Sequence, residues 1–418
     1  MYSSENTEIK DLSLAPSGRD KIDWVIPNMP VLRAIERRFA KEKPFSGMRA
    51  AISIHLEAKT AYFANVLRSG GAEVFVTGCN PLSTQDDVAA ALAADGFAVN
   101  AFHGASPADY ERHLVRTLSC RPDFIVDDGG DLLHILHTSH PEFAKNLRGG
   151  CEETTTGVIR MRARADAGEL NFPMIAVNDA NSKHLFDNRY GTGQSVWDAI
   201  MHTTNLMVTG KTVVVAGYGF CGKGVAKNAR AIGANVIVTE VDPHAALEAC
   251  LDGCRVMPME QAAPLGDIFI TVTGCRDVIT KKHFELMKDN AILCNAGHFD
   301  VEVNVRELRG MSVSERERKP NIRGFVLPDG RTLNVLGEGR LVNLAAGNGH
   351  PAEIMDMSFS LQCLCCEYVA LHSDRLHPRA VTDVPPELDR EVARIKLSET
   401  GVSIDALTEA QKKYLASW

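Results

Sequence analysis

Short apolar runs alternate with amphipathic stretches along the first third of the chain. The pattern predicts strands at 49–55, 73–78, 97–102 and 124–128, and helices at 29–39, 58–69, 87–95 and near 108–118. Buried strands separated by helices are typical of an α/β domain with a mainly parallel sheet. In such sheets ligands lie outside the carboxyl ends of the strands. His55, Cys79 and Asp128 fall at or just beyond such ends, so we expect them near a ligand.

A second alternating series begins near residue 193 and predicts a second domain of the same class. Its strands are expected at 212–216, 235–239, 267–272 and 291–295, followed by a hairpin over 325–336 that turns at Asp329-Gly330. From residue 350 the chain becomes helical (352–371), which predicts a return to the first domain. The expected fold is therefore α/β, with two Rossmann-like doubly wound domains, a cleft between them and a helical C-terminal tail. We expect the first domain at 1–190, completed by about 350–385, the second at 191–349, and the charged tail at 386–418.

Three glycines follow the apolar run 213–216 and precede a helix-forming stretch. In this Gly-x-Gly-x-x-Gly pattern Gly217 allows a tight turn, Gly219 lets the backbone approach a pyrophosphate, and Gly222 lets helix and strand pack closely. The pattern alone also occurs in ordinary glycine-rich turns. Here the next strand ends in Glu240, where a carboxylate holds both ribose hydroxyls of NAD and repels the 2′-phosphate of NADP. Strand, turn, helix, strand and acid in this order predict NAD as the cofactor.

Composition narrows the class of protein. The 418 residues are 45% apolar and 23% charged, as in ordinary globular proteins. A formal net charge of −8 and an isoelectric point near 6.0 argue against nucleic-acid binding, because no basic stripe is present to displace counterions from phosphates. No apolar run reaches membrane-spanning length, and the first residues lack the basic start and apolar core of a signal peptide. We therefore expect a cytoplasmic protein that does not bind membranes.

Eleven cysteines are scattered along the chain, and an odd number in a chain of this length does not predict a disulfide framework. Cys363, Cys365 and Cys366 are close together, but they fall in a helical segment and have no partner cluster elsewhere. We interpret them as small core residues and predict no metal site.

Four polar stretches are dense in reactive groups. They are Asp127-Asp128-Gly-Gly-Asp131, 151–157 with two carboxylates and three threonines, 178–188 with Lys183 and Asp187 four residues apart, and 295–300 around His298. Each also has a plain structural interpretation, because acids after a strand cap helices, a lysine and an aspartate form solvated pairs, and a single histidine often occupies a turn. Their joint presence beside a dinucleotide fingerprint favours a catalytic site.

Nearly the whole chain resembles the S-adenosyl-L-homocysteine hydrolase family. The matching motifs are Ser83-Thr84-Gln85-Asp86, Asp127-Asp128-Gly-Gly-Asp131, Glu152-Glu153-Thr-Thr-Thr156-Gly157, Phe186-Asp187-Asn188, Ala216-Gly217-Tyr-Gly219 with Gly222-Lys-Gly224, Gly297-His298-Phe-Asp, and Gly339-Arg-Leu-Val-Asn343 with Gly349-His350-Pro351. The resemblance implies a tightly held NAD⁺, a substrate domain that closes on a cofactor domain, and a homotetramer. It also implies reversible, NAD-dependent hydrolysis of S-adenosyl-L-homocysteine to adenosine and homocysteine.

The implied reaction cleaves a thioether, which has no easy route of direct hydrolysis. Oxidation of the 3′-hydroxyl acidifies C4′–H, the carbanion expels the thiol from C5′, water adds, and the ketone is reduced again. The resemblance assigns this catalysis to His55, Asp128, Glu153, Lys183, Asp187, Asn188 and His298. Lys183, with its pKa lowered in a dry cleft and tuned by Asp187, is expected to assist removal of the 3′-hydroxyl proton. Asp128 takes the C4′ proton, and His55, with His298 nearby, handles the protons of thiol and water.

The resemblance also implies binding contacts. Glu153 is expected to grip ribose hydroxyls, and Asn188 to position Lys183 and the cofactor. Residues expected near the substrate are Glu57, Lys59, Thr192, Asn348 and His350. Residues expected at the cofactor are Thr154, Thr155, Thr156, Gly217, Gly219, Phe220, Cys221, Gly222, Glu240, Thr273, Asn295 and Asn343.

The chain departs from the common family pattern at the base-binding end. The usual His-x-Thr-x-Glu reads His55-Leu-Glu57-Ala-Lys59, as in archaeal and thermophilic relatives, some of which act on S-inosylhomocysteine. Lys59 cannot accept a hydrogen bond from the amino group of adenine, but it can donate one of roughly 1.5–3 kcal/mol to the 6-carbonyl of hypoxanthine. Alternatively, Lys59 pairs with Glu57 and backbone groups read the base.

Three smaller departures accompany this one. Asn348 stands where the common form has methionine, Thr192 replaces a cysteine, and the sequence ends at Trp418 without the Lys/Tyr-bearing extension that reaches a neighbouring subunit's NAD. Three functions therefore remain open: a hydrolase of S-adenosyl- or S-inosyl-homocysteine, a related dehydratase that expels water from a free nucleoside, and a non-catalytic NAD-binding regulator. Retention of the full set of reactive groups argues against the regulator.

Overall fold

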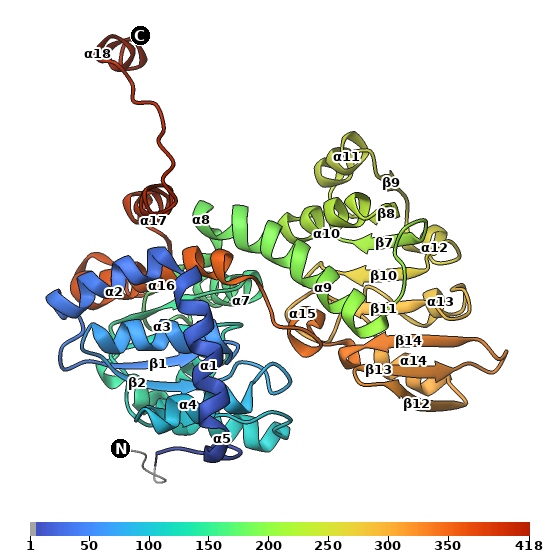
Figure 1. Ribbon diagram of the computed structural model, residues 1–418, viewed down its shortest axis with the longest axis horizontal. Coiled ribbons are helices and arrows are strands. Elements are labelled where there is room, and N and C mark those ends of the chain that lie inside the picture. The colour runs from blue at the N-terminus through green and yellow to red at the C-terminus, as the bar shows by residue number, and fades with distance from the viewer. Residues whose placement is uncertain (1–5) are drawn as a thin grey trace.

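The first lobe is built around a parallel sheet. The computed structural model describes residues 6–418 as two lobes that lie side by side (Figure 1). The sheet of the first lobe has the order β15-β6-β5-β4-β1-β2-β3, and every neighbouring pair is parallel. Its strands are β1 (Arg49–Ser53), β2 (Glu73–Thr77), β3 (Ala98–Asn100), β4 (Phe124–Asp127), β5 (Gly149–Glu152), β6 (Met174–Ala176) and β15 (Val381–Asp383).

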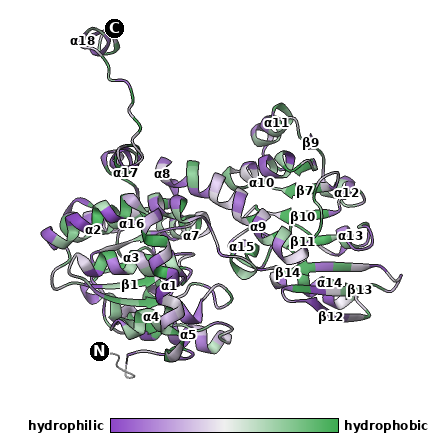
Figure 2. Cartoon of the chain, viewed as in Figure 1, coloured by the Kyte–Doolittle hydropathy of each residue, from purple (hydrophilic) through white to green (hydrophobic). Residues whose placement is uncertain are grey.

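Helices cover both faces of this sheet because successive strand residues point to opposite sides. On one face Ile52 and Val126 join a core with α1 (Ala15–Val25), α2 (Pro30–Glu42), α3 (Ala58–Ser69), α4 (Asp86–Ala94), α16 (Ala352–His372) and α17 (Pro386–Glu399). On the other face Ala51 and Ile125 join a core with α5 (Pro107–Leu118), α6 (Asp131–His137) and α7 (Thr155–Asp166). Figure 2 shows the apolar strands inside this mixed outer layer.

The second lobe repeats this plan. Its strands are β7 (Thr212–Ala216), β8 (Asn235–Thr239), β9 (Arg255–Val256), β10 (Ile268–Thr271), β11 (Ile292–Asn295), β12 (Ser314–Lys319), β13 (Ile322–Val326) and β14 (Thr332–Leu336). Its helices are α9 (Thr192–Thr204), α10 (Phe220–Ala231), α11 (Pro243–Leu251), α12 (Met259–Ala262), α13 (Lys281–Phe284), α14 (Val305–Met311) and α15 (Val342–Ala345). Two apolar cores, one on each face of the sheet, hold it together.

Both sheets have the strand order that defines doubly wound folds. Counted within each lobe, the order is 3-2-1-4-5-6, with β15 added at one edge of the first sheet and the β12–β13 hairpin pair at one edge of the second. The predicted fold class is confirmed. In each sheet the strand order reverses between the first and fourth strands, and such folds bind ligands at this switch point.

The chain crosses between the lobes twice. The first crossing runs from α8 (Asn181–Lys183) through a π-helix at His184–Gly191 into α9, and the second enters α16 after α15. Figure 1 shows this helical segment running from α8, above the first lobe, down to α9 in the second lobe. After the second crossing, α16 packs on β4 and β5 of the first sheet.

Several elements were not predicted from the sequence; they include strands β5, β6, β9 and β15, helix α1 and the edge strand β12. The polar N-terminal arm contains α1, which is held by close packing, since the backbone of Gly18 lies against the carbonyl of Asp87 on α4. The edge strand β12 has only exposed residues (Ser-Glu-Arg-Glu-Arg-Lys) and so gives no apolar alternation, although it pairs antiparallel with β13. The predicted hairpin is confirmed in β13 and β14, with Gly330 at φ 90° in its turn.

The expectation that no apolar run reaches membrane-spanning length is wrong for helix α16. In the described part of the chain it is long and apolar enough to cross a membrane, which the sequence reading had excluded for every run. Its apolar window is 78% buried inside the protein, and Cys363, Cys365 and Cys366 are buried with it. Burial of this kind is typical of a core helix, in agreement with the interpretation of these cysteines.

The tail divides into two parts. Helix α17 packs on α2, α8 and α16. Beyond it, residues 401–418 are exposed throughout, and α18 (Glu409–Leu415) stands away from both lobes (Figure 1).

Candidate active site

A cavity of about 1110 Å³ lies between the lobes, at the carboxyl ends of both sheets. Most of the residues predicted for catalysis and binding line its wall: His55, Glu57, Lys59, Asp128, Glu153, Thr154, Thr155, Thr156, Lys183, Asp187, Asn188, Thr192, Gly217, Gly219, Phe220, Cys221, Glu240, Thr273, His298, Asn343 and His350. Segments far apart in the sequence thus meet at one place.

Three predicted contact residues lie off this wall. Gly222 is buried beneath it, and a Cβ there would lie 2.1 Å from the carbonyl oxygen of Gly217, so its role is close packing of α10. The Asn295 amide donates to the carbonyls of Gly297 and Phe299 and accepts from Gly297 N–H, so it shapes the turn that carries His298. Asn348 contributes its backbone carbonyl to Lys59.

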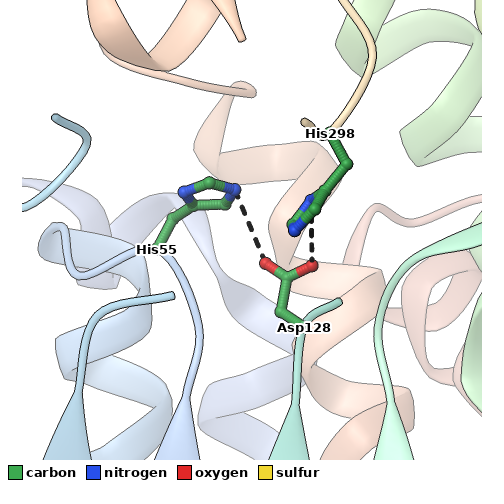
Figure 3. A group of neighbouring side chains, drawn as sticks. All are labelled: His55, Asp128 and His298. Carbon is green, nitrogen blue, oxygen red and sulfur yellow. Dashed lines mark ion pairs between the residues drawn. The ribbon is translucent and has the colours of Figure 1, made fainter. Parts of the chain in front are cut away.

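One carboxylate lies between two imidazoles at the end of the cavity that is expected to hold the sugar, called the sugar end below (Figure 3). Asp128 Oδ2 is 3.6 Å from His55 Nε2, and Asp128 Oδ1 is 3.7 Å from His298 Nδ1. Cys79 Sγ donates to Asp128 Oδ2 at 3.2 Å. His55 and Asp128 belong to the first lobe and His298 to the second, so this contact joins the two lobes.

The environment of His55 fixes its protonation. The Ser83 hydroxyl donates to the carbonyl of Asn80, so it accepts from His55 Nδ1 at 2.6 Å and leaves Nε2 free toward Asp128. Burial, aided by His298 and His350, outweighs the attraction of Asp128 and lowers the pKa of His55 to about 4. His55 is therefore a neutral imidazole with a free nitrogen facing the carboxylate of Asp128.

The side chains of His55, Asp128 and His298 have ligand atoms within 4.8 Å of one another. Their residue types and spacing would allow them to hold a metal ion. An aspartate between two histidines serves equally well as a set of proton donors and acceptors.

A buried lysine lies on the other side of the sugar end. Lys183 Nζ is 3.5 Å from Glu153 Oε1 and from Asp187 Oδ1, and it donates to Asn188 Oδ1 at 2.9 Å. The π-helix that follows Lys183 brings Asp187 and Asn188 round to face it. Burial alone would lower the pKa of Lys183, but the charges of Asp187 and Glu153 outweigh burial and raise it. The expected lowered pKa is wrong: Lys183 is an ammonium group in this arrangement.

The carboxylates around Lys183 differ in charge. Burial, followed by the charge of Asp187, raises the pKa of Glu153 to about 7 against the pull of Lys183. For Asp187 burial is overcome by Lys183, by His350 Nδ1 at 2.8 Å and by the Ser358 hydroxyl at 2.6 Å, which hold its pKa below the ordinary range. Glu153 is thus the group that gains and loses a proton near neutrality, and Asp187 stays ionised.

The second lobe has the shape that a dinucleotide requires. Gly217 adopts φ 102°, and a Cβ there would lie 2.9 Å from the carbonyl of Val272. A Cβ at Gly219 would meet open space, which leaves room for a pyrophosphate at the start of α10. Glu240 directly follows β8 and accepts the N–H of Tyr218, so its carboxylate lies beside the glycine turn. These features fit the adenosine half of NAD.

The nicotinamide half has a counterpart at Asn343. Its amide donates to the Ser195 hydroxyl, while its buried Oδ1 has no hydrogen-bond partner within residues 6–418. An unpaired buried acceptor is costly, and a carboxamide N–H of a bound nicotinamide would satisfy it. Thr273 is fixed nearby by Glu302, which accepts from its backbone N–H and its hydroxyl. The residues present therefore fit NAD.

The end of the cavity that is expected to hold the nucleobase, called the base end below, contains an ion pair between Lys59 and Glu57. Lys59 Nζ is 2.8 Å from Glu57 Oε2 and donates to the carbonyl of Asn348 at 3.0 Å, and both side chains are buried. Glu57 also caps α3 by accepting the N–H of Lys59. Both groups line the cavity, so a base there meets a paired lysine and a paired glutamate.

Comparison with known proteins identifies the family of this chain. Residues 188–349 match the family described as S-adenosyl-L-homocysteine hydrolase, NAD binding domain, and residues 6–143 match S-adenosyl-L-homocysteine hydrolase. The chain belongs to the S-adenosyl-L-homocysteine hydrolase family. The predicted family and the NAD cofactor are confirmed.

Relatives under two functional names are about equally similar to this family member. An adenosylhomocysteinase of Pyrococcus abyssi is 54% identical over 98% of this chain and 97% of its own. An S-inosyl-L-homocysteine hydrolase of Methanocaldococcus jannaschii is 53% identical over 98% of this chain and 99% of its own. An adenosylhomocysteinase of Thermococcus kodakarensis is 55% identical over 98% and 97%.

Two polar side chains of α16 that bind the carboxylates beside Lys183 were not predicted from the sequence. Gln362 Nε2 donates to Glu153 Oε2 at 2.6 Å, and Ser358 donates to Asp187, so this apolar helix holds the two carboxylates beside Lys183. Asn178, on the cavity wall, accepts from Asn188 at 3.1 Å. A signal was present for α16: polar residues stand alone in an otherwise apolar helix, where each needs a partner.

Proposed function

We propose that this chain hydrolyses S-adenosyl-L-homocysteine to adenosine and homocysteine through transient oxidation of the sugar at C3′. The observation that carries this proposal is the pairing of two clusters at one end of the cavity. The Asp128 group lies where a C4′ proton can be removed, and the Lys183 group lies where a 3′-hydroxyl can be bound. NAD, when bound, accepts the hydride of C3′ and returns it at the end of the cycle.

Proton removal at O3′ is assigned to the Lys183–Glu153 pair. The Lys183 ammonium stabilises the negative charge that develops on O3′, and the Glu153 carboxylate, ionised above pH 7, takes the proton. Asp187 keeps Lys183 charged, and Asn188 holds its ammonium in place.

Asp128 removes the proton from C4′ once C3′ is a ketone. The electron pair left on C4′ forms the C4′–C5′ double bond and the C5′–S bond breaks with its pair on sulfur. His55, which is neutral and 3.6 Å from Asp128, takes the C4′ proton from Asp128 and transfers it to the departing thiolate. Water then adds its hydroxyl to C5′ and its proton to C4′ through the same groups, with His298 beside Asp128.

The identity of the base has a second candidate. Lys59 is a donor at the base end, and a relative named for S-inosyl-L-homocysteine is 53% identical to this chain. Both observations favour S-inosyl-L-homocysteine as an alternative substrate. The Glu57 carboxylate beside Lys59 is an acceptor that the amino group of adenine needs, and it supports the adenosyl substrate.

An assay with three substrates tests these proposals. Purified protein loaded with NAD is given S-adenosylhomocysteine, S-inosylhomocysteine or a free nucleoside, and thiol release and the ultraviolet spectrum are followed. Thiol release from the first substrate is expected. Release from the inosyl substrate alone supports the second candidate, and release from neither, with water lost from the nucleoside, identifies a dehydratase and contradicts the hydrolase.

We also propose that residues 1–190, completed by about 350–385, bind the nucleoside and that 191–349 bind NAD. The exposed tail supports a homotetramer, because Ile404, Leu407, Tyr414 and Trp418 are at least half exposed on a segment that stands away from its own lobes. A second copy of this chain is the partner that such a tail fits. Removal of residues 402–418 should lower the molar mass in light scattering, and an unchanged mass would contradict this role.

We further propose a cytoplasmic location and a place in one-carbon metabolism. The cysteines support the location, because all eleven are free thiols, as expected in a reducing compartment. Hydrolysis of S-adenosyl-L-homocysteine would support the metabolic role.

A further inference from the structure

Glu152 is a buried carboxyl group that none of the catalytic steps above uses. It ends β5, is fully buried, and pairs in register with Asp127 of β4. Its Oε1 accepts two backbone hydrogen bonds, from the N–H of Gly129 at 2.8 Å and from the N–H of Thr154 at 3.0 Å. One oxygen atom therefore binds the residue after Asp128 and the residue after Glu153.

We propose that Glu152 is a positioning residue, which fixes the C4′ base relative to the groups that hold the ribose by tying the Asp128 turn to the Glu153–Thr154 turn. This inference rests on the proposed function. Asp128 and Glu153 act on neighbouring carbons of one sugar, so the distance between their turns decides whether both reach it. A displacement of about 1 Å is enough to cost about a hundredfold in rate.

The Asp128 turn needs such a tie because its own backbone is pliable. Gly129 and Gly130 have φ of 106° and 79°, a region that glycine enters freely in unfolded and folded chains alike. Asp127 fixes the near side of the turn by accepting the N–H of Asp128 and of Leu133. Glu152 fixes the far side and is the contact that continues to the neighbouring strand.

Glu152 is buried beside Asp127 and Asp128, which disfavours a further negative charge there. Burial, and after it the charges of Asp127 and Asp128, raise the pKa of Glu152 well above its ordinary value. Its second oxygen, Oε2, has no hydrogen-bond partner in the described chain. A neutral acid that uses one oxygen as an acceptor has a close isostere in glutamine.

Gly157 makes room for this carboxyl group. A Cβ at Gly157 would lie 2.1 Å from both Cδ and Oε1 of Glu152, whereas its helical backbone would accept any side chain. Gly157→Ala therefore displaces the Glu152 carboxyl group without removing it. This substitution disturbs the same hydrogen bonds as Glu152→Ala by an independent route.

Amide hydrogen exchange in NAD-loaded protein tests the tie directly, without use of the reaction. Glu152→Ala and Gly157→Ala should each raise the exchange rates of the Gly129 and Thr154 amides about tenfold or more, because both lose their acceptor. Glu152→Gln keeps Oε1 and should leave both amides protected within about threefold. Protection that survives in Glu152→Ala, or that is lost equally in Glu152→Gln, would overturn the proposal.

Kinetics test the consequence for the proposed reaction. The kcat for thiol release should fall about 10- to 100-fold in Glu152→Ala and in Gly157→Ala, with KM within about threefold, and Glu152→Gln should recover most of the loss. The double variant Glu152→Ala/Gly157→Ala should be no slower than Glu152→Ala alone, because the methyl group no longer meets a carboxyl group. Full additivity of the two losses in kcat, or an unchanged kcat, would overturn the positioning role of Glu152.

Absence of thiol release in the unaltered protein would instead contradict the proposed function. Protection of the Gly129 and Thr154 amides would still show whether Glu152 ties the two turns together. If Glu152→Ala does not fold, Gly157→Ala decides both readouts.

Discussion

At the sugar end of the cavity, charged side chains from separate segments of both lobes lie close together. At the base end, by contrast, Lys59 and Glu57 of one turn form a single ion pair, and Lys59 donates to one backbone carbonyl. Removing any one group at the sugar end leaves several buried charges without their balance. At the base end one substitution changes one pair. In the proposed function, the chemistry at the sugar therefore depends on many residues of this chain and recognition of the base on few.

The largest effect is expected from Lys183→Ala. It removes the charge that stabilises O3′ and leaves Glu153 and Asp187 facing each other unbalanced. We expect cofactor reduction, followed as absorbance on mixing with adenosine, to fall by about 10³- to 10⁴-fold. Asp187→Asn keeps the ammonium and should be slowed less. Cofactor reduction at an unchanged rate in Lys183→Ala would exclude its role in the first step.

Asp128→Asn should separate the two halves of the sugar end. The amide cannot take the C4′ proton, so thiol release should fall about 10²- to 10³-fold while cofactor reduction persists. Incorporation of solvent deuterium at C4′ should fall with thiol release. The matched control is Asp131→Asn on the same turn, where the carboxylate contacts Tyr110 and Arg160. Deuterium incorporation as fast in Asp128→Asn as in the control would assign the base elsewhere.

Much of the order of elements could be predicted from the sequence because most of the central strands have an apolar run and each lobe has its own alternating series. The strand and helix limits at β7, β8 and α3 were predicted to the residue. Helix α1 and strand β12 could not be, because one is held by a glycine contact with α4 and the other by backbone pairing at a sheet edge. Tertiary contacts of this kind leave no periodic signal.

The site was predictable as a set of residues and not as a set of charges. The sequence motifs predicted that His55, Asp128 and Lys183 belong to one site, and all three line the same cavity. Such a prediction is possible because the carboxyl ends of parallel strands lie at one edge of a sheet. The state of Lys183 was predicted wrongly, since burial and two carboxylates act on its pKa in opposite directions and only their distances decide the result. Gln362 and Glu152 were not assigned a role, because their partners are fixed by packing and by backbone N–H groups that the sequence does not mark.

The base end can be tested by restoring the common pattern. The double variant Glu57→Thr/Lys59→Glu replaces a donor by an acceptor and avoids two facing carboxylates. We expect the ratio of kcat/KM for S-adenosyl- over S-inosyl-homocysteine to rise about 10- to 100-fold, the range of one charge-assisted hydrogen bond. Glu57→Gln, which keeps Lys59, serves as the control. A ratio that does not move in the double variant means that backbone groups read the base.

The smallest effect expected is a pH dependence confined to the sugar end. Because the pKa of Glu153 is raised to about 7, its carboxylate can take the O3′ proton only above that pH. Cofactor reduction should therefore be about tenfold slower at pH 6 than on the plateau, and Glu153→Gln should be slow at every pH. Stability changes in the opposite sense: between the ordinary carboxyl pKa and pH 7 the folded protein holds the extra proton, so this group's contribution falls as pH rises. The adenosyl-to-inosyl ratio should stay constant over the same range, since both substrates share O3′. A ratio that follows the same pH curve would show that the two ends of the cavity are coupled and would break the distinction between them.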